Sequence, residues 1–127
     1  MLEEYNDLKI NNSEKIIFIK RGCFYYCLYR DSYIISYLFN YKVINDRLSF
    51  PITNKINVCI KLNELNIGYI IDNDIVYGDS ENYNKYFKLG YDKVKVDYII
   101  SDINNILIKL DIDKLINIRN KLYEHDK

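Results

Sequence analysis

The residues with the clearest chemical potential lie in residues 15–29, which read KIIFIKRGCFYYCLY. Two adjacent cations, Lys20 and Arg21, are followed closely by the aromatic residues Phe24 and Tyr26. Cations attract phosphate groups, and aromatic rings stack on nucleic-acid bases. The combination therefore suits a partner with stackable faces and negative charge. The alternative reading of the two cations is a solvated turn.

Two strands and a turn must position these side chains. Residues 16–19 are a continuous apolar run, the pattern of a strand covered on both sides. Gly22 interrupts the run, and Gly tolerates the positive φ that a tight reversal often needs. The second strand then alternates between two faces, with Cys23, Tyr25, Cys27 and Tyr29 on one and Phe24, Tyr26 and Leu28 on the other. One face must meet the core, and the other offers large rings beside the cations.

The charge balance sets limits on the partner. The chain has 127 residues, with 18 Lys plus Arg and 18 Asp plus Glu, so its net charge at pH 7 is zero. Any nucleic-acid site must therefore be a local patch, because no global field attracts nucleic acid or an anionic membrane. No apolar run approaches the roughly 20 residues that span a bilayer. Three cysteines without a signal-peptide pattern predict free, buried thiols in a reducing cytoplasm.

Few groups are available for catalysis or for binding a metal. The one histidine, His125, lies near the last residue, so no nucleophile–base pair can be assembled. Cys23 and Cys27 share one predicted strand, which is poor geometry for a metal knuckle. Asp72 and Asp74 are not followed by the Gly and Glu of a calcium loop. We therefore predict no enzyme, no cofactor and no bound metal.

Hydrophobic periodicity along the chain predicts an α/β domain. Helices are expected over residues 1–12, 31–40 and 54–65, with N-caps at Asp31 and at Thr53 or Asn54. The third helix is expected to pack through Ile56, Cys59 and Ile60, with Val58, Leu62 and Leu65 as further candidates. Further strands are expected over residues 42–44, 48–52, 68–71 and 75–77, with Pro51 at a sheet edge or exit. This alternation predicts a mixed β-sheet flanked by helices.

The pattern changes after residue 78. Residues 79–90 are polar and rich in tyrosine, which predicts a loop with one helical turn. A helix with an apolar stripe is expected from residue 91, although residues 94–96 could instead form a last strand. Asp111 or Asp113 is expected to cap a final helix. Without a linker or a repeat, the sequence predicts a single domain over residues 1–127, in which these two helices close over residues 2–78.

Residues 3–31 resemble the start of domain I, the N-terminal mismatch-recognition domain, of the MutS family of DNA mismatch-repair proteins. Tyr5 and Lys9 match a Q-Y-x-x-x-K-like opening, and Gly22, Phe24 and Tyr25 match an [R/K]-x-G-x-F-Y-E turn and strand, which leads to an acidic helix start, here Asp31. Phe50 and Pro51 resemble the family's step before its next helix. The resemblance covers roughly residues 2–78 and implies the domain I fold with a helical C-terminal segment.

The resemblance also implies roles for the two rings. In the family the aromatic residue of the motif wedges into the duplex beside a mismatched or unpaired base, and the Glu two residues later hydrogen-bonds to that base. Phe24 would be the wedge, and Tyr26 stands at the Glu position, where a phenol offers a single hydrogen bond. The two side chains would lie about 7 Å apart on one strand face, which also suits general base stacking. The chain has no G-x-x-x-x-G-K-[S/T] phosphate loop, so no ATPase is expected.

Two functions are compatible with these features. The first is a cytoplasmic, DNA-binding accessory protein that stacks or wedges an aromatic ring at distorted or mismatched DNA, with Phe24, Tyr26, Lys20 and Arg21 as its contacts and Gly22 and Pro51 as structural residues. The second is a non-catalytic module for a protein partner or a homodimer, through the tyrosine-rich segment or the last helix. An exposed Phe24 beside a positive patch favours the first, and burial of Phe24 under residues 94–123 favours the second.

Overall fold

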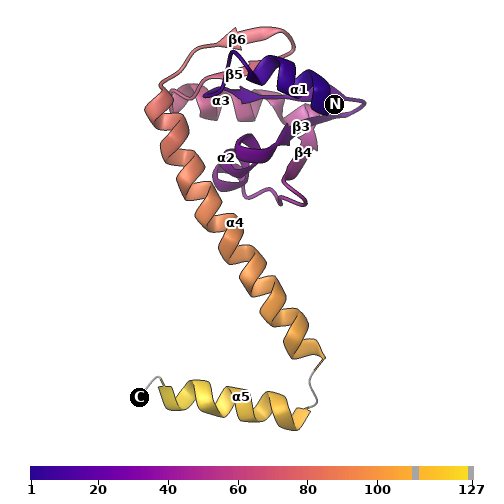
Figure 1. Cartoon of the computed structure of the whole chain (residues 1–127), viewed down its shortest axis with the longest axis vertical. Helices are drawn as coiled ribbons and strands as arrows, with labels where there is room; N and C mark the ends of the chain where they lie inside the picture. Colours follow the sequence, from indigo (N-terminus) through magenta and orange to yellow (C-terminus); the bar gives the residue numbers. More distant parts are fainter. Residues whose placement is uncertain (110–111, 126–127) are drawn as a thin grey trace. The chain divides into compact units, whose positions relative to one another are not determined.

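The computed structural model describes residues 1–109 and 112–125 (Figure 1). The chain divides into two compact units, Met1–Val94 and Lys95–Lys127. The predicted α/β class with a helical C-terminal segment is confirmed. The expected cap at Asp111 lies outside the described residues.

Helices and short strands alternate through the first unit. Its elements are α1 (Leu2–Lys9), β1 (Ile16–Ile17), β2 (Ile19–Arg21), β3 (Phe24–Leu28), α2 (Tyr29–Phe39), β4 (Arg47–Pro51), the 3-10 turn η1 (Ile52–Asn54), α3 (Lys55–Glu64), β5 (Tyr69–Ile71), β6 (Asp74–Val76) and the first part of α4 (Ser80–Ile108). The second unit contains the rest of α4 and α5 (Ile112–His125).

The strands form two three-stranded sheets. One has the order β1-β5-β6 and is mixed, because β1 is parallel to β5 and β6 is antiparallel to it. The other has the order β2-β3-β4 and is antiparallel throughout, with Pro51 on its edge strand as expected. The apolar run at residues 16–19 supplies a strand to each sheet, and Phe18 stands at the crossing, where its N–H donates to the Ile70 carbonyl at 3.0 Å.

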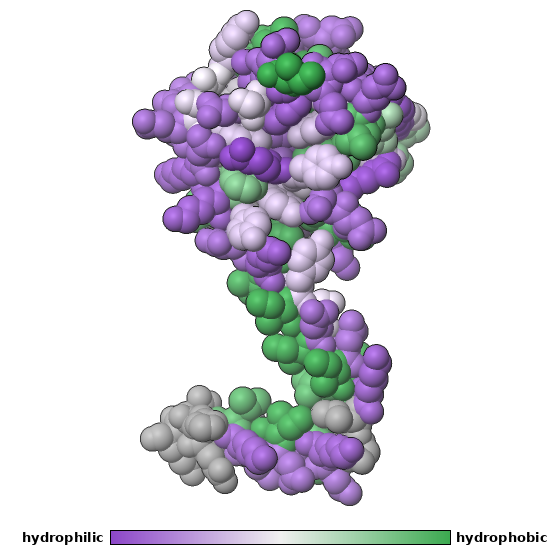
Figure 2. Space-filling view, viewed as in Figure 1, coloured by the Kyte–Doolittle hydropathy of each residue, from purple (hydrophilic) through white to green (hydrophobic). Residues whose placement is uncertain are grey.

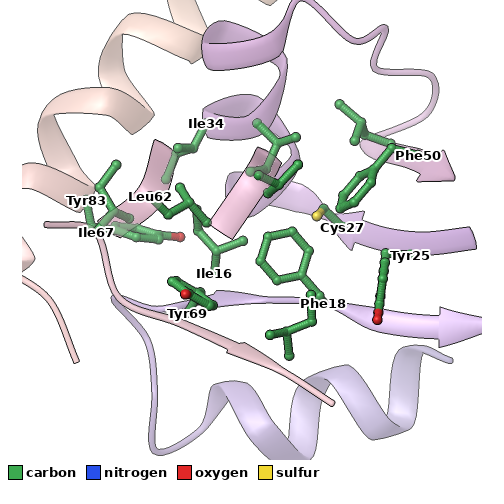
Figure 3. Packing of buried hydrophobic residues seen from close by; sticks show 14 of the residues in the cluster. Ile16, Phe18, Tyr25, Cys27, Ile34, Phe50, Leu62, Ile67, Tyr69 and Tyr83 are labelled. Carbon is green, nitrogen blue, oxygen red and sulfur yellow. The ribbon is translucent and has the colours of Figure 1, made fainter. Parts of the chain in front are cut away.

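The same run is covered on both sides, as predicted. Ile16 and Phe18 point into the main core, whereas Ile17 and Ile19 join a smaller cluster under Tyr5 of α1. In the main core the Phe18 ring meets the rings of Phe50 and Tyr69 edge-on, at centroid distances of 5.7 and 6.3 Å (Figure 3). The alternation of β3 is also confirmed, since Tyr25 and Cys27 are buried in this core.

Three local expectations were wrong. Tyr29 is the first residue of α2, and residues 42–44 form no strand but an isolated bridge between Ile44 and Arg47. On α3, Ile56 and Ile60 are exposed, whereas the further candidates Val58 and Leu62 are buried and Cys59 packs against the core. The face of α3 that carries Val58 and Leu62 therefore meets the sheets.

In the segment expected as a loop with one helical turn, residues 80–90 are helical throughout and begin α4. The Asp79 carboxylate accepts a hydrogen bond from the Glu81 N–H at 2.8 Å, as an N-cap does. Tyr83 is completely buried, and Gly90 lies against α2, where an added Cβ would come within 2.1 Å of the Tyr33 carbonyl oxygen. Packing against α2 therefore stabilises residues 80–90 as a helix, although most of their side chains are polar.

Beyond Val94, none of the side chains whose burial the structure describes is buried. Figure 2 shows hydrophobic residues along this part of α4 and on α5. Among the described helices, none is both long enough and apolar enough to cross a membrane.

Candidate nucleic-acid interface

The β2–β3 hairpin positions the predicted site. Arg21 pairs with Phe24 across the strands, so Gly22 and Cys23 form a two-residue turn. Gly22 has φ +59° and would have no atom within 4 Å of an added Cβ, so the backbone conformation and not the available space favours glycine. Cys23 is exposed in this turn, contrary to the expectation of a buried thiol. The turn places Phe24 directly beside the hairpin tip.

The strand register defines which residues share the outer face of the β2-β3-β4 sheet. Paired residues of antiparallel strands lie on the same face. The outer face is therefore formed by Ile19 and Arg21 of β2, by Phe24, Tyr26 and Leu28 of β3, and by Arg47, Ser49 and Pro51 of β4. Helix α1 covers Ile19 and Leu28, through the cluster around Tyr5. Phe24 remains 42% exposed and Tyr26 is half-buried.

Arg47 completes this face and was missed from the sequence. Its guanidinium carbon lies 4.6 Å from the centroid of the Tyr26 ring, a cation–π contact. Residues 47–51 alternate between exposed and buried, with Leu48 and Phe50 in the core. That alternation marks Arg47 as outward-facing, but only the pairing of β4 with β3 puts it beside Tyr26.

The second cation of the face is Arg21, which is already paired. Its Nη2 lies 2.6 Å from Oε2 of Glu4 on α1, and both side chains are about half exposed. Exposed ion pairs contribute only about 0–1 kcal/mol, so a phosphate group can compete for the guanidinium. The Glu4 carboxylate borders the site and opposes an anion there.

Lys20 lies on the other side of the sheet. It pairs with the buried Tyr25, so its side chain is directed away from the face that carries Phe24. Together with Glu4, Phe18 and Asp72 it lines a pocket of about 350 Å³. The structure therefore brings together Phe24, Tyr26 and Arg21, adds Arg47, and leaves Lys20 apart.

Near that pocket, Asp72 links three elements. Its Oδ2 accepts hydrogen bonds from the Tyr25 hydroxyl at 2.5 Å and from Lys55 Nζ at 2.7 Å. These two donors, Lys55 first, hold the pKa of Asp72 below its usual range. The contact supports the inner side of β3, which presents Phe24 and Tyr26 on its outer side.

A buried polar network lies under α1, at the part of the sheet that this helix covers. The Asp31 carboxylate is completely buried and accepts hydrogen bonds from Lys9 Nζ at 2.7 Å, from the hydroxyls of Tyr83 and Tyr5 at 2.5 and 3.1 Å, and from the Ile17 N–H at 3.0 Å. The expected role of Asp31 as an N-cap was wrong, since Leu28 is the N-cap of α2 and no side chain caps it. Asp31 instead joins α1, β1, α2 and α4.

Burial sets the protonation behaviour of this network. Removal from water raises the pKa of Asp31, although Lys9 and the other donors oppose the shift. The same cause lowers the pKa of Lys9 and raises the pKa of both tyrosines, Tyr5 and Tyr83, well above their usual range. Tyr5 and Lys9, which are among the residues that carry the family resemblance, thus donate hydrogen bonds to Asp31, which is another of them.

The thiols and the acidic residues offer no evident metal site. All three cysteines are free, and burial raises the pKa of the Cys27 thiol. Within residues 1–109 and 112–125, no group of three or more His, Cys, Asp or Glu side chains is arranged to hold a metal ion.

Comparison with known proteins supports the resemblance seen in the sequence. The family model described as MutS domain I matches residues 1–60. A search of curated proteins gave no match. The matched residues contain α1, the β2-β3-β4 sheet and the first turns of α3, and therefore the whole outer face with Phe24 and Arg47.

Proposed function

We propose, on the premise that residues 1–60 are a MutS domain I, that this protein binds DNA through the outer face of its β2-β3-β4 sheet. In this role it is a non-enzymatic, cytoplasmic accessory protein that wedges or stacks Phe24 at distorted or mismatched DNA, without an ATPase. The observation that carries the proposal is the exposure of Phe24, 42%, on the same face as Arg21 and Arg47.

The position of Phe24 suits a wedge. Apolar side chains that enter the minor groove partly unstack a base step and kink the duplex, which costs a few kcal/mol. A mispaired or unpaired base lowers that cost, because the step is already weakened. Phe24 stands at the end of β3, beside the turn at Gly22, so the ring extends from a rigid strand that is anchored in the core by Tyr25.

The charges near the ring suit phosphate contacts. Arg47 and Arg21 lie on either side of β3, on the neighbouring strands β4 and β2. A guanidinium binds phosphate oxygens in a bidentate manner and remains charged at all relevant pH values. Although the chain has no net charge, two guanidinium groups thus lie on the proposed face, with Glu4 paired to the one of Arg21.

Tyr26 determines what the site can read. Its ring is covered on one side by Arg47, and its hydroxyl offers one hydrogen bond where the family has a carboxylate. We therefore expect affinity for distorted DNA with weak discrimination between mismatches.

Fluorescence anisotropy tests the proposal, with labelled homoduplex, mismatched duplex and duplex with one unpaired base, at ~50 and ~200 mM salt. We expect salt-sensitive binding that Phe24→Ala removes and that the control Tyr77→Ala retains, since Tyr77 is exposed but outside residues 1–60. No binding of the full chain to any of the three probes at low salt would refute the proposal.

A second candidate, a protein-interaction module, is favoured by one observation. The second unit exposes a row of large apolar side chains that no described part of the chain buries. This candidate does not require DNA binding to be absent, because the row and the outer face belong to different units.

A further inference from the structure

In the second unit, none of the side chains whose burial the structure describes is buried. Eleven large apolar or aromatic side chains in its described part are exposed, namely Val96, Tyr98, Ile99, Ile100, Ile103, Ile106, Ile108, Ile116, Ile118, Leu122 and Tyr123. Helices in water gain most of their stability from packing of an apolar face and little from propensity alone. The helical state of this unit therefore requires a surface that covers these side chains.

The exposed residues of α4 follow a regular spacing. Val96, Ile99, Ile103 and Ile106 are separated by three, four and three residues, the a and d positions of two heptads. We call these four residues the α4 stripe; they are between 50% and 61% exposed. Such a stripe is the pattern by which one helix packs along another.

The charges of this unit do not favour an anionic partner. Residues 95–127 contain six Lys or Arg and six Asp or Glu, so their net charge is zero with His125 neutral. A helix that binds a membrane surface or nucleic acid is typically rich in Lys and Arg on its polar face. A surface with balanced charges meets no net repulsion from a copy of itself.

We propose that residues 95–125 form a homodimerisation element, in which the α4 stripes of two chains pack against each other. A standard stable interface buries about 800 Å² on each partner, and the α4 stripe together with the exposed Ile118 and Leu122 of α5 supplies an apolar centre for such an interface. The a positions are Val96 and Ile103 and the d positions are Ile99 and Ile106; β-branched residues at d favour assemblies of more than two helices. Two chains that each supply the distal part of α4 and α5 provide four.

The sequence suggested two segments for a homodimer contact, the tyrosine-rich segment and the last helix, and the fold favours the second. The tyrosine-rich residues 79–90 pack on α2 within the first unit, since Tyr83 is buried and Gly90 contacts the α2 backbone. The last helix is retained as a contributor through Ile118 and Leu122, which are exposed. The structure adds the α4 stripe to the residues proposed for the homodimer contact.

Sedimentation equilibrium of the full chain tests the proposal. We expect a particle of twice the chain mass of 15.3 kDa for the unmodified protein and a monomer for Ile99→Glu/Ile103→Glu. The matched control Ser101→Glu/Asn105→Glu adds the same two charges at exposed positions outside the α4 stripe and should remain a dimer. Circular dichroism establishes whether the first unit stays folded in each variant.

Two results would overturn the proposal. A monomeric unmodified protein over a wide concentration range would exclude self-association, whatever the variants do. A dimer that persists in Ile99→Glu/Ile103→Glu would place the contact elsewhere. Binding of a monomeric protein to neutral or anionic vesicles would assign the exposed side chains to a lipid surface instead.

Discussion

The guanidinium of Arg47 covers the ring of Tyr26, with 4.6 Å between the guanidinium carbon and the ring centroid. The two residues lie on adjacent strands, and the same sheet face carries Phe24. A cation–π contact at an exposed site contributes about 0.5–1 kcal/mol, enough to orient Arg47 without fixing it. The contact therefore keeps a positive charge beside the proposed wedge.

Replacing Arg47 tests this arrangement. We expect Arg47→Ala to weaken DNA binding and to reduce the slope of log K against log salt by about one, because one phosphate contact is lost. The matched control is Lys20→Ala, which removes the same charge from the opposite side of the sheet and should leave the slope unchanged. Equal effects of the two variants would show that only net charge matters.

Tyr26→Glu introduces the carboxylate of the family motif. We expect lower affinity for homoduplex DNA, because a negative charge replaces the Tyr26 ring beside Arg47 and repels phosphate groups. We also expect a larger ratio of mismatch affinity to homoduplex affinity, because the carboxylate can accept a hydrogen bond from a displaced base. Anisotropy with the two duplexes measures the ratio. Tyr26→Gln is the control for size without charge. An unchanged ratio in Tyr26→Glu would indicate that the site reads shape alone.

Asp31→Asn should destabilise the first unit strongly. The substitution leaves Lys9 without its carboxylate in a largely buried position, and breaking such a pair typically costs about 3–5 kcal/mol. Urea denaturation followed by circular dichroism measures the loss as a fall in the midpoint. Asp92→Asn, an exposed position on α4, is the control. The double variant Asp31→Asn/Lys9→Met should recover part of the loss, and a purely additive result would contradict a coupled pair.

Stability should fall at alkaline pH. Burial holds the pKa of Tyr83 and of Tyr5 above the ordinary value of 10.0, so in the folded protein both hydroxyls keep a proton that the unfolded chain releases. Their contribution is fully present below about pH 10 and is lost as the pH rises above it. Denaturant titrations at increasing pH measure the slope.

Tyr83→Phe should make that slope shallower, because it removes one of the tyrosines whose pKa is raised by burial. The exposed Tyr77→Phe should not alter it. A slope that is the same in all three proteins would mean that Tyr83 already ionises in the folded state.

The sequence was sufficient for the parts of the site that depend on local pattern. Gly22 located the turn, and the alternation of β3 separated the buried Tyr25 from Phe24 and Tyr26. The same alternation separates Lys20 from Arg21, since neighbouring residues of a strand point to opposite faces. The contact of Lys20 with DNA stays a prediction, with its side chain directed to the face opposite Arg21.

The parts that depend on long-range packing could not be predicted. Asp31 has the residue type and position of an N-cap, and its partner Tyr83 lies 52 residues away in sequence. Tyr83 itself was assigned to a polar loop. A tyrosine can be buried only where a partner accepts or donates a hydrogen bond to its hydroxyl, and the sequence does not show that partner. Arg47 required the register between β3 and β4, which no local pattern supplies.

The network around Asp31 has a consequence for how the first unit opens. Its one carboxylate binds Tyr5 and Lys9 of α1, the N–H of Ile17 in β1 and Tyr83 of α4, while Asp31 itself belongs to α2. Segments that share such a buried contact tend to open together and not one at a time. Amide hydrogen exchange should therefore report these four elements as a single cooperative unit.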